Sequence, residues 1–99
     1  MPSDSGSGDE LRHELASHRF TLSSAGAIAV LSYRLVDAST VEYYHTYVPP
    51  ALRGRGLASR LAAYALRHAL DNGLTVVPTC PFVAAFIRKN PEYAAVLGH

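Results

Sequence analysis

Hydrophobic and polar residues alternate along the first half of the chain, and this two-residue period predicts β-strands. The period is clear in residues 19–22, in residues 27–36 and in residues 40–48. Small and polar residues separate these runs at 23–26 and at 37–39, as is typical of turns. Strands joined by such short connections pair as neighbours, so we expect an antiparallel meander.

Strict alternation also predicts which side chains share a face of the sheet, because successive strand residues point to opposite sides. Within residues 27–36, one face is expected to carry Leu31, Tyr33 and Leu35. In residues 40–48, the side chains expected to share one face are Val41, Tyr43, His45 and Tyr47.

The second half of the chain changes to a helical period. Residues 56–72 place apolar side chains along one side of a helix, and Asn72-Gly73 is a typical helix end. The members of this apolar stripe are Leu57, Leu61, Ala62, Ala65, Leu66, Ala69 and Leu70.

A short apolar run at residues 74–78 follows the helix and has the character of a buried strand. Cys80 is then the expected N-cap of a second helix, because proline at position 81 suits the first helical turn. Pro91 stops this helix, and residues 91–97 are expected to add one more helical turn.

A strand, a helix and a strand in this order predict a parallel crossover. The sequence thus predicts an α+β fold, an α/β sandwich in which an antiparallel β-meander precedes a helix, a strand and a helix. We expect one domain over residues 11–99 and a disordered tail over the polar residues 1–10. Residues 11–17 leave a short turn and the start of a strand as equal alternatives.

The composition narrows the classes of partner. A net charge of +1 over 99 residues gives no global attraction to nucleic acid or to an acidic membrane, so neither is expected. The single cysteine cannot form an internal disulfide, and no zinc-site spacing joins it to the histidines. With no apolar run of membrane-spanning length and no signal-peptide pattern at the N-terminus, we expect a cytoplasmic protein.

The connection between the third strand and the first helix holds the main candidate site. Pro49-Pro50 ends the strand, since proline cannot donate to a sheet ladder. Gly54 and Gly56 let the backbone turn and let a ligand approach. The next residues form the first turn of the helix, where amide groups lack partners and the helix dipole is positive. Such an arrangement predicts an anion site, most often for phosphate.

The run Arg53-Gly54-Arg55-Gly56-Leu57-Ala58 resembles the pattern Q/R-x-x-G-x-G/A of the GNAT-type N-acetyltransferases, with matches at Arg53, Gly56 and Ala58. Three further strings resemble a subgroup of very small, single-domain GNAT-like proteins. They are His45-Thr46-Tyr47-Val48-Pro49-Pro50, Cys80-Pro81-Phe82-Val83 and Asn90-Pro91-Glu92-Tyr93. The resemblance extends from Arg19 to Leu97.

This resemblance implies acetyl-coenzyme A as cosubstrate. The loop from Arg53 to Ala58 would hold the pyrophosphate, and Arg55 would add a charge-assisted bond. The strands at 40–48 and 74–78 would splay apart around the pantetheine arm, to which Tyr47 and Val48 would offer main-chain bonds. The alternative is an ordinary strand–helix connection whose arginines are solvated.

Two side chains are candidates for catalysis. A helix N-terminus favours a thiolate, so Cys80 is a candidate nucleophile that accepts the acetyl group; its alternative is a small buried residue. His45 is a candidate general base, and its alternative is a hydrogen-bonded structural histidine.

The function implied by the resemblance is N-acetyl transfer from acetyl-coenzyme A to an amine, either directly or through Cys80. A noncatalytic coenzyme A-binding or protein-interaction module on the same fold is the alternative. Full-size members of the superfamily carry helices between their first two strands, whereas only residues 23–26 stand there in this chain. The acceptor pocket is therefore expected to be absent, open, or supplied by a protein partner.

Overall fold

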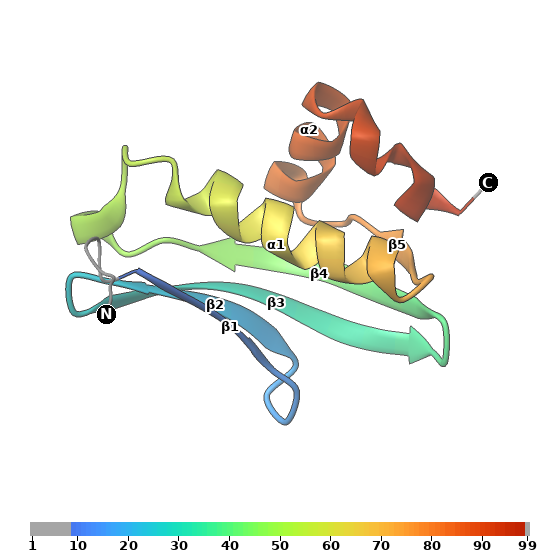
Figure 1. The fold of residues 1–99 in the computed structure, drawn as a ribbon, viewed down its shortest axis with the longest axis horizontal. Coiled ribbons are helices and arrows are strands. Elements are labelled where there is room, and N and C mark those ends of the chain that lie inside the picture. The colour runs from blue at the N-terminus through green and yellow to red at the C-terminus, as the bar shows by residue number, and fades with distance from the viewer. Residues whose placement is uncertain (1–8, 99) are drawn as a thin grey trace.

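A five-stranded sheet with helices packed against it forms the protein, in a computed structural model that describes residues 9–98 (Figure 1). The strands are β1 (Glu10–Glu14), β2 (Arg19–Ser24), β3 (Ala27–Asp37), β4 (Thr40–Tyr47) and β5 (Thr75–Val77). The α-helices are α1 (Leu57–Asp71) and α2 (Pro81–Lys89), and the 3₁₀-helices are η1 (Pro50–Leu52) and η2 (Pro91–Leu97).

The strands lie side by side in chain order, which confirms the predicted meander and crossover. The pairs β1–β2, β2–β3 and β3–β4 are antiparallel, whereas β4 and β5 are parallel and are joined through α1. For residues 11–17 the sequence left a turn and the start of a strand as alternatives. The structure has a strand there, because β1 pairs with β2 from Glu10 to Glu14. Glu10, expected in the tail, thus belongs to the sheet, and residues 1–8 lie outside the described part of the chain.

A β-bulge in β4 breaks the predicted alternation. Tyr33 of β3 pairs with Tyr43, and its neighbour Ser32 pairs with His45, so Tyr44 is an extra residue on β4. A bulge bends its strand and shifts every later side chain by one position relative to strict alternation.

The prediction that His45 and Tyr47 share a face with Tyr43 is therefore wrong. Beyond the bulge it is Thr46 that stands opposite the buried Leu31, on the face of the sheet that packs against α1. His45 and Tyr47 lie on the other face, which we call the outer face.

The core lies between the inner face of the sheet and α1. The predicted stripe of α1 is buried at Leu57, Leu61, Ala62, Ala65, Leu66 and Ala69. Beneath it, the side chain of Tyr43 is 1% exposed, and its hydroxyl donates to the carbonyl of Ala65 at 2.7 Å. This bond satisfies a polar atom that would otherwise be costly to bury.

The second helix begins and ends as predicted. Cys80 is its N-cap residue, Pro81 is its first residue, and Asn90 is its C-cap. The predicted last helical turn is present as η2, which packs against α1 and α2 near the β4–β5 side of the sheet (Figure 1).

Candidate functional site

The candidate loop adopts the conformation that only glycine accepts readily. Gly54 and Gly56 have φ of 79° and 70°, and a side chain built on either would meet nothing within 4 Å. The backbone of the loop is therefore bare on the side where a Cβ would stand. A ligand can approach it closely there.

A pocket of about 240 Å³ opens at this loop. Its walls come from the chain just after β4, η1, the loop, the first turn of α1, and α2. The lining residues are Val48, Leu52, Arg53, Gly54, Gly56, Leu57, Ala58, Ser59 and Phe82. Six of the eight residues predicted to bind the cofactor thus line one pocket. The other two, Tyr47 and Arg55, are not part of its wall.

The first turn of α1 makes this pocket favourable for an anion. Gly56 is the N-cap, no side chain caps the helix, and the first turn holds no acidic residue. The amides of a helix's first turn have no partner within the helix, and the dipole adds a partial positive charge there. Backbone donors and a positive field thus meet at an open surface.

Two arginines flank the loop, and each is anchored. Arg53 donates from Nε to the carbonyl of Val48 at 2.9 Å. Arg55 places Nη2 3.5 Å from the hydroxyl of Ser24, at the end of β2. The first contact fixes the end of β4 against the loop. Main-chain bonds from Val48 to the coenzyme arm were predicted, and one of its two main-chain groups, the carbonyl, already accepts a bond from Arg53.

The strands β4 and β5 part halfway along β4. Their last registered pair is Glu42 with Val77, and one more backbone bond runs from the Cys80 amide to the Tyr43 carbonyl at 3.0 Å. Beyond it, residues 44–47 of β4 have no β5 partner in the described chain. This opening begins at the bulge and arises because β5 ends at Val77; that it holds a pantetheine arm stays a prediction.

Cys80 lies on the wall of the splay, but it is buried. It is 4% exposed, and its Sγ lies 3.4 Å from the hydroxyl of Thr46. Thr46 reaches the sulfur only because the bulge turns it to the inner face. Sequence reasoning that assumed strict alternation put Thr46 on the opposite side and missed this contact.

The two predicted catalytic side chains are not brought together. Cys80 contacts Thr46 on the inner face, whereas His45 is exposed on the outer face, opposite Ser32. A direct proton transfer from the Cys80 thiol to His45 is therefore not supported by the arrangement of β4.

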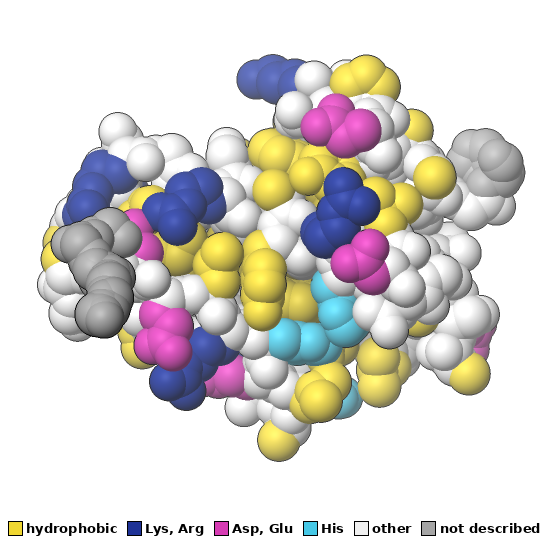
Figure 2. Space-filling model, in the orientation of Figure 1, with side chains coloured by type: hydrophobic (Ala, Val, Ile, Leu, Met, Phe, Trp, Pro, Cys, Tyr) yellow, Lys and Arg dark blue, Asp and Glu magenta, His cyan; other side chains and the backbone are white. Residues whose placement is uncertain are grey.

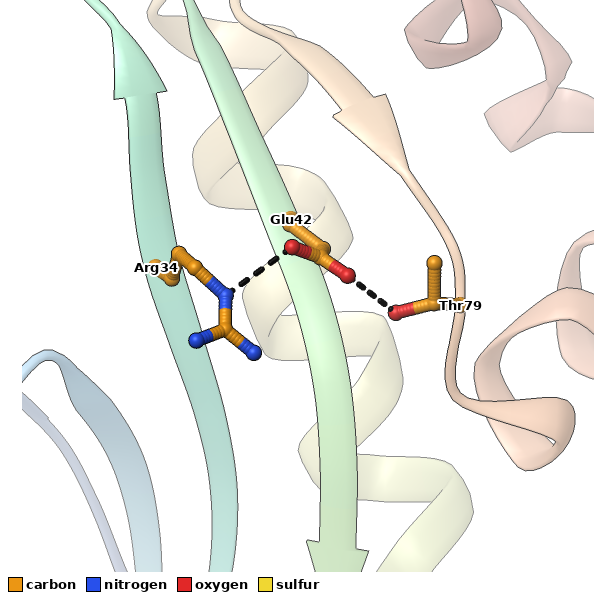
Figure 3. Close-up of polar contacts among 3 residues, drawn as sticks. All are labelled: Arg34, Glu42 and Thr79. Carbon is orange, nitrogen blue, oxygen red and sulfur yellow. Dashed lines mark hydrogen bonds and ion pairs between the residues drawn. The ribbon is translucent and has the colours of Figure 1, made fainter.

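A carboxylate that the sequence did not single out stands where β4 and β5 part. Glu42 accepts a bond from Arg34 Nε at 3.0 Å and one from the Thr79 hydroxyl at 2.7 Å (Figure 3). Figure 3 shows both contacts on the side of the sheet away from α1. The Thr79 bond and the Arg34 bond lower the pKa of Glu42, so it is ionised at neutral pH. An acidic residue beside the end of a parallel strand is the sequence feature by which Glu42 could have been found.

Neither a metal centre nor a membrane span emerges from residues 9–98. They contain no cluster of three or more histidine, cysteine or acidic side chains suited to a metal ion. None of the helices in this part is both long and apolar enough to cross a bilayer.

Known proteins resemble the chain over most of its length. Residues 19–96 match the family model of the GCN5-related N-acetyl-transferases. Protein NATD1 of Xenopus tropicalis is 33% identical over 90 residues, which cover 89% of this chain and 83% of that protein. Protein NATD1 of Homo sapiens is 35% identical over 83 residues, covering 82% of this chain and 74% of its own.

The fold has a solved counterpart. A GCN5-like protein of Staphylococcus aureus, determined by NMR in solution, superimposes with a TM-score of 0.69 at 27% identity. The match covers 88% of this chain and 85% of that protein.

Proposed function

Because the chain belongs to the GCN5-related N-acetyltransferase family, we propose that it binds acetyl-coenzyme A and transfers the acetyl group to an amine. The observation that carries this proposal is the pocket at the N-terminus of α1, where Gly54 and Gly56 leave the loop bare. Backbone amides at a helix start suit the pyrophosphate of the coenzyme.

In the proposed complex, the amides of the first turn of α1 donate to the pyrophosphate. The helix dipole supports a negative charge at this position by about 0.3–1 kcal/mol. Arg55 contacts the Ser24 hydroxyl and lies close enough to Asp9 to lower the pKa of that carboxylate, so its guanidinium would turn from these two groups to a phosphate.

The pantetheine arm would follow the unpaired stretch of β4. Residues 44–47 have no β5 neighbour there, so main-chain groups of this stretch, including Tyr47, can bond an extended amide chain. The arm would reach the thioester toward the point where Glu42 stands.

The reaction is attack of an amine nitrogen on the thioester carbonyl. A carbon–nitrogen bond forms, the carbon–sulfur bond breaks, and the coenzyme leaves as a thiolate while the amine loses a proton. Ionised Glu42 would attract a cationic amine, since its lowered pKa makes it a better charge partner than proton acceptor. His45, on the same outer face, is the proposed base.

The burial of Cys80 favours direct transfer over a route through an acetylated cysteine. A thiol that is 4% exposed and contacts Thr46 is poorly placed to attack a thioester. We therefore expect Cys80→Ala to keep its transfer rate within about threefold of the parent, a change typical of a packing residue. A loss of activity together with an acetylated Cys80 in the parent protein would establish the two-step route.

A noncatalytic module that binds coenzyme A is the second candidate. It is favoured by the burial of Cys80 and by the outward position of His45, which leave neither predicted catalytic group exposed on the inner wall of the splay. Intact-mass spectrometry after incubation of acetyl-coenzyme A with peptides bearing a free lysine decides between the candidates, because only an enzyme adds acetyl to the peptide.

Binding is tested by calorimetry with coenzyme A and the variant Gly56→Glu. A carboxylate at this position would occupy the open space and repel the pyrophosphate. We expect affinity to fall at least tenfold, about 1.4 kcal/mol. A folded Gly56→Glu protein with parental affinity would overturn the assignment of the loop.

The matched control is Gly73→Glu. Gly73 also has positive φ, 65°, and nothing within 4 Å of a built Cβ, but it follows the opposite end of α1. Both variants therefore carry a similar backbone strain, of about 1–3 kcal/mol. Only the loop variant should lose coenzyme A.

A further inference from the structure

A second pocket lies on the inner face of the sheet, at the C-terminal end of α1 and away from the coenzyme loop. Its volume is about 110 Å³. Side chains from the β1–β2 turn, from three strands, from α1 and from the segment before β5 line it together with His13 of β1. They are His13, Leu15, Phe20, Tyr33, Leu35, Val41, Tyr43, His68 and Leu74.

Two imidazoles and two phenols, those of Tyr33 and Tyr43, form the polar part of this pocket. His13 Nε2 lies 2.7 Å from the hydroxyl of Tyr33, and the His13 ring stacks on Phe20 with centroids 4.2 Å apart. The His68 ring meets His13 edge-on at 4.5 Å. Figure 2 shows histidine side chains gathered beside hydrophobic ones on the side of the molecule where α1 faces the viewer.

The imidazole pair has no acidic partner within the pocket. None of the nine lining residues is acidic, and the described acids on the same elements are engaged elsewhere. Glu14 pairs with Arg19 at 2.6 Å, and Asp71 lies 3.8 Å from Arg67. Burial and the charge of His68 both lower the pKa of His13. A negatively charged group beside the two rings, which are in edge contact with each other, would supply the missing counter-charge.

The apolar part is the size of one small ring. A dry cavity of about 150 Å³ accepts benzene. This pocket, of about 110 Å³, is smaller but open, so a single ring or a branched chain of similar bulk would fill it and extend through its mouth. Its rim leaves large apolar side chains in solvent: Leu15 is 69% exposed and Leu35 is 56% exposed. A bound ring would cover both.

We propose that this pocket binds a small monocarboxylate whose body is a single ring or a short branched chain. The body fills the space between Phe20, Leu35 and Leu74. The carboxylate accepts bonds from His13 Nδ1 and His68 Nε2, the ring nitrogens that Tyr33 and Asn72 do not engage. The site is separate from the coenzyme pocket and does not depend on the transferase proposal, since the two pockets share no lining residue.

The test is an amide NMR titration of the whole chain with benzoate, with benzyl alcohol as the neutral isostere and sodium sulfate as the bare anion. We expect benzoate to shift Leu15, Leu35 and His68 together, and to bind at least about threefold more tightly than benzyl alcohol. Equal shifts with sulfate, or benzoate shifts confined to Gly54 and Gly56, would overturn the proposal.

The pH dependence adds a second readout. A cationic imidazole in this pair strengthens binding of a carboxylate, and the neighbouring phenols of Tyr33 and Tyr43, whose pKa values burial raises, stay uncharged at neutral pH. Benzoate should therefore bind more tightly at about pH 5.5 than at about pH 8, whereas benzyl alcohol should not change. If benzoate binding does not depend on pH, the imidazoles do not bind the carboxylate and the proposal is wrong.

Two variants of matched size at the rim isolate the effect of a negative charge on binding. Leu35→Glu brings a negative charge to the mouth, and Leu35→Gln has the same shape without the charge. Ile28→Glu places the same charge at another exposed apolar position, 50% exposed and opposite Ser23 of β2. We expect Leu35→Glu alone to weaken benzoate at least about threefold relative to Leu35→Gln. Equal affinity in these two variants would contradict a carboxylate head at this rim.

Discussion

At the scale of single residues, Tyr43 joins the sheet to α1 and yields a stability prediction. Its hydroxyl donates to the Ala65 carbonyl at 2.7 Å, and burial together with nearby Tyr33 raises its pKa, so it remains a donor at any physiological pH. Tyr43→Phe should lower the free energy of unfolding by about 1 kcal/mol, as for other buried hydrogen bonds. Urea denaturation measures it, with Tyr44→Phe on the exposed outer face as control. Equal effects of the two changes would contradict a role for the bond.

Glu42 gives a prediction about how the stability of the folded protein depends on pH. Its pKa is lowered in the folded protein by the Thr79 and Arg34 bonds, so its contribution is present above the unfolded pKa and is lost as pH falls through the folded one. Urea unfolding of the parent and of Glu42→Gln at several pH values should give the parent the larger free energy of unfolding at pH 7. The difference should shrink as the pH falls toward about 3. A constant difference would mean that the carboxylate charge contributes nothing.

At the scale of elements, features that depend on residues close in sequence were predicted, whereas features that depend on the register in which strands pair were not. The apolar stripe of α1, the glycines of its leading loop and the proline start of α2 depend on residues close in sequence, and all were predicted. The face of His45 was not, because it depends on how β4 pairs with β3, and an extra residue at Tyr44 leaves no mark in the alternation itself. The contact of Thr46 with Cys80 was missed for the same reason.

The bulge carries its own prediction. Deleting Tyr44 would let residues 45–47 keep their pairing with β3, because the extra residue is the one removed. The variant should fold, losing the contact of Tyr44 with the Arg34 guanidinium, 4.3 Å from its ring centroid, worth about 0.5–1 kcal/mol. A straighter β4 should narrow the splay and weaken coenzyme A at least about tenfold. Far-UV dichroism checks folding, and unchanged affinity would show that the bulge does not open the site.

At the scale of the whole molecule, the coenzyme pocket joins elements that are distant in the chain. Val48 follows β4, Leu52 belongs to η1, Leu57 opens α1, and Phe82 comes from α2. A ligand seated among them bridges the sheet and both helices. Because so small a domain unfolds as one unit, such a ligand stabilises the whole fold and not only the loop.

The thermal midpoint therefore reports on the pocket. Coenzyme A at 100 times its dissociation constant adds about 2.7 kcal/mol to the folded state. For a domain of this length each kcal/mol moves the midpoint by about 4–8 °C, so we expect a rise of roughly 10–20 °C. Inorganic phosphate at the same concentration should give a much smaller shift, because it touches the first turn of α1 but not Val48 or Phe82. The control variant Gly73→Glu should keep the full shift, and Gly56→Glu should lose most of it. An equal rise in these two variants would show that the ligand stabilises the protein from another surface.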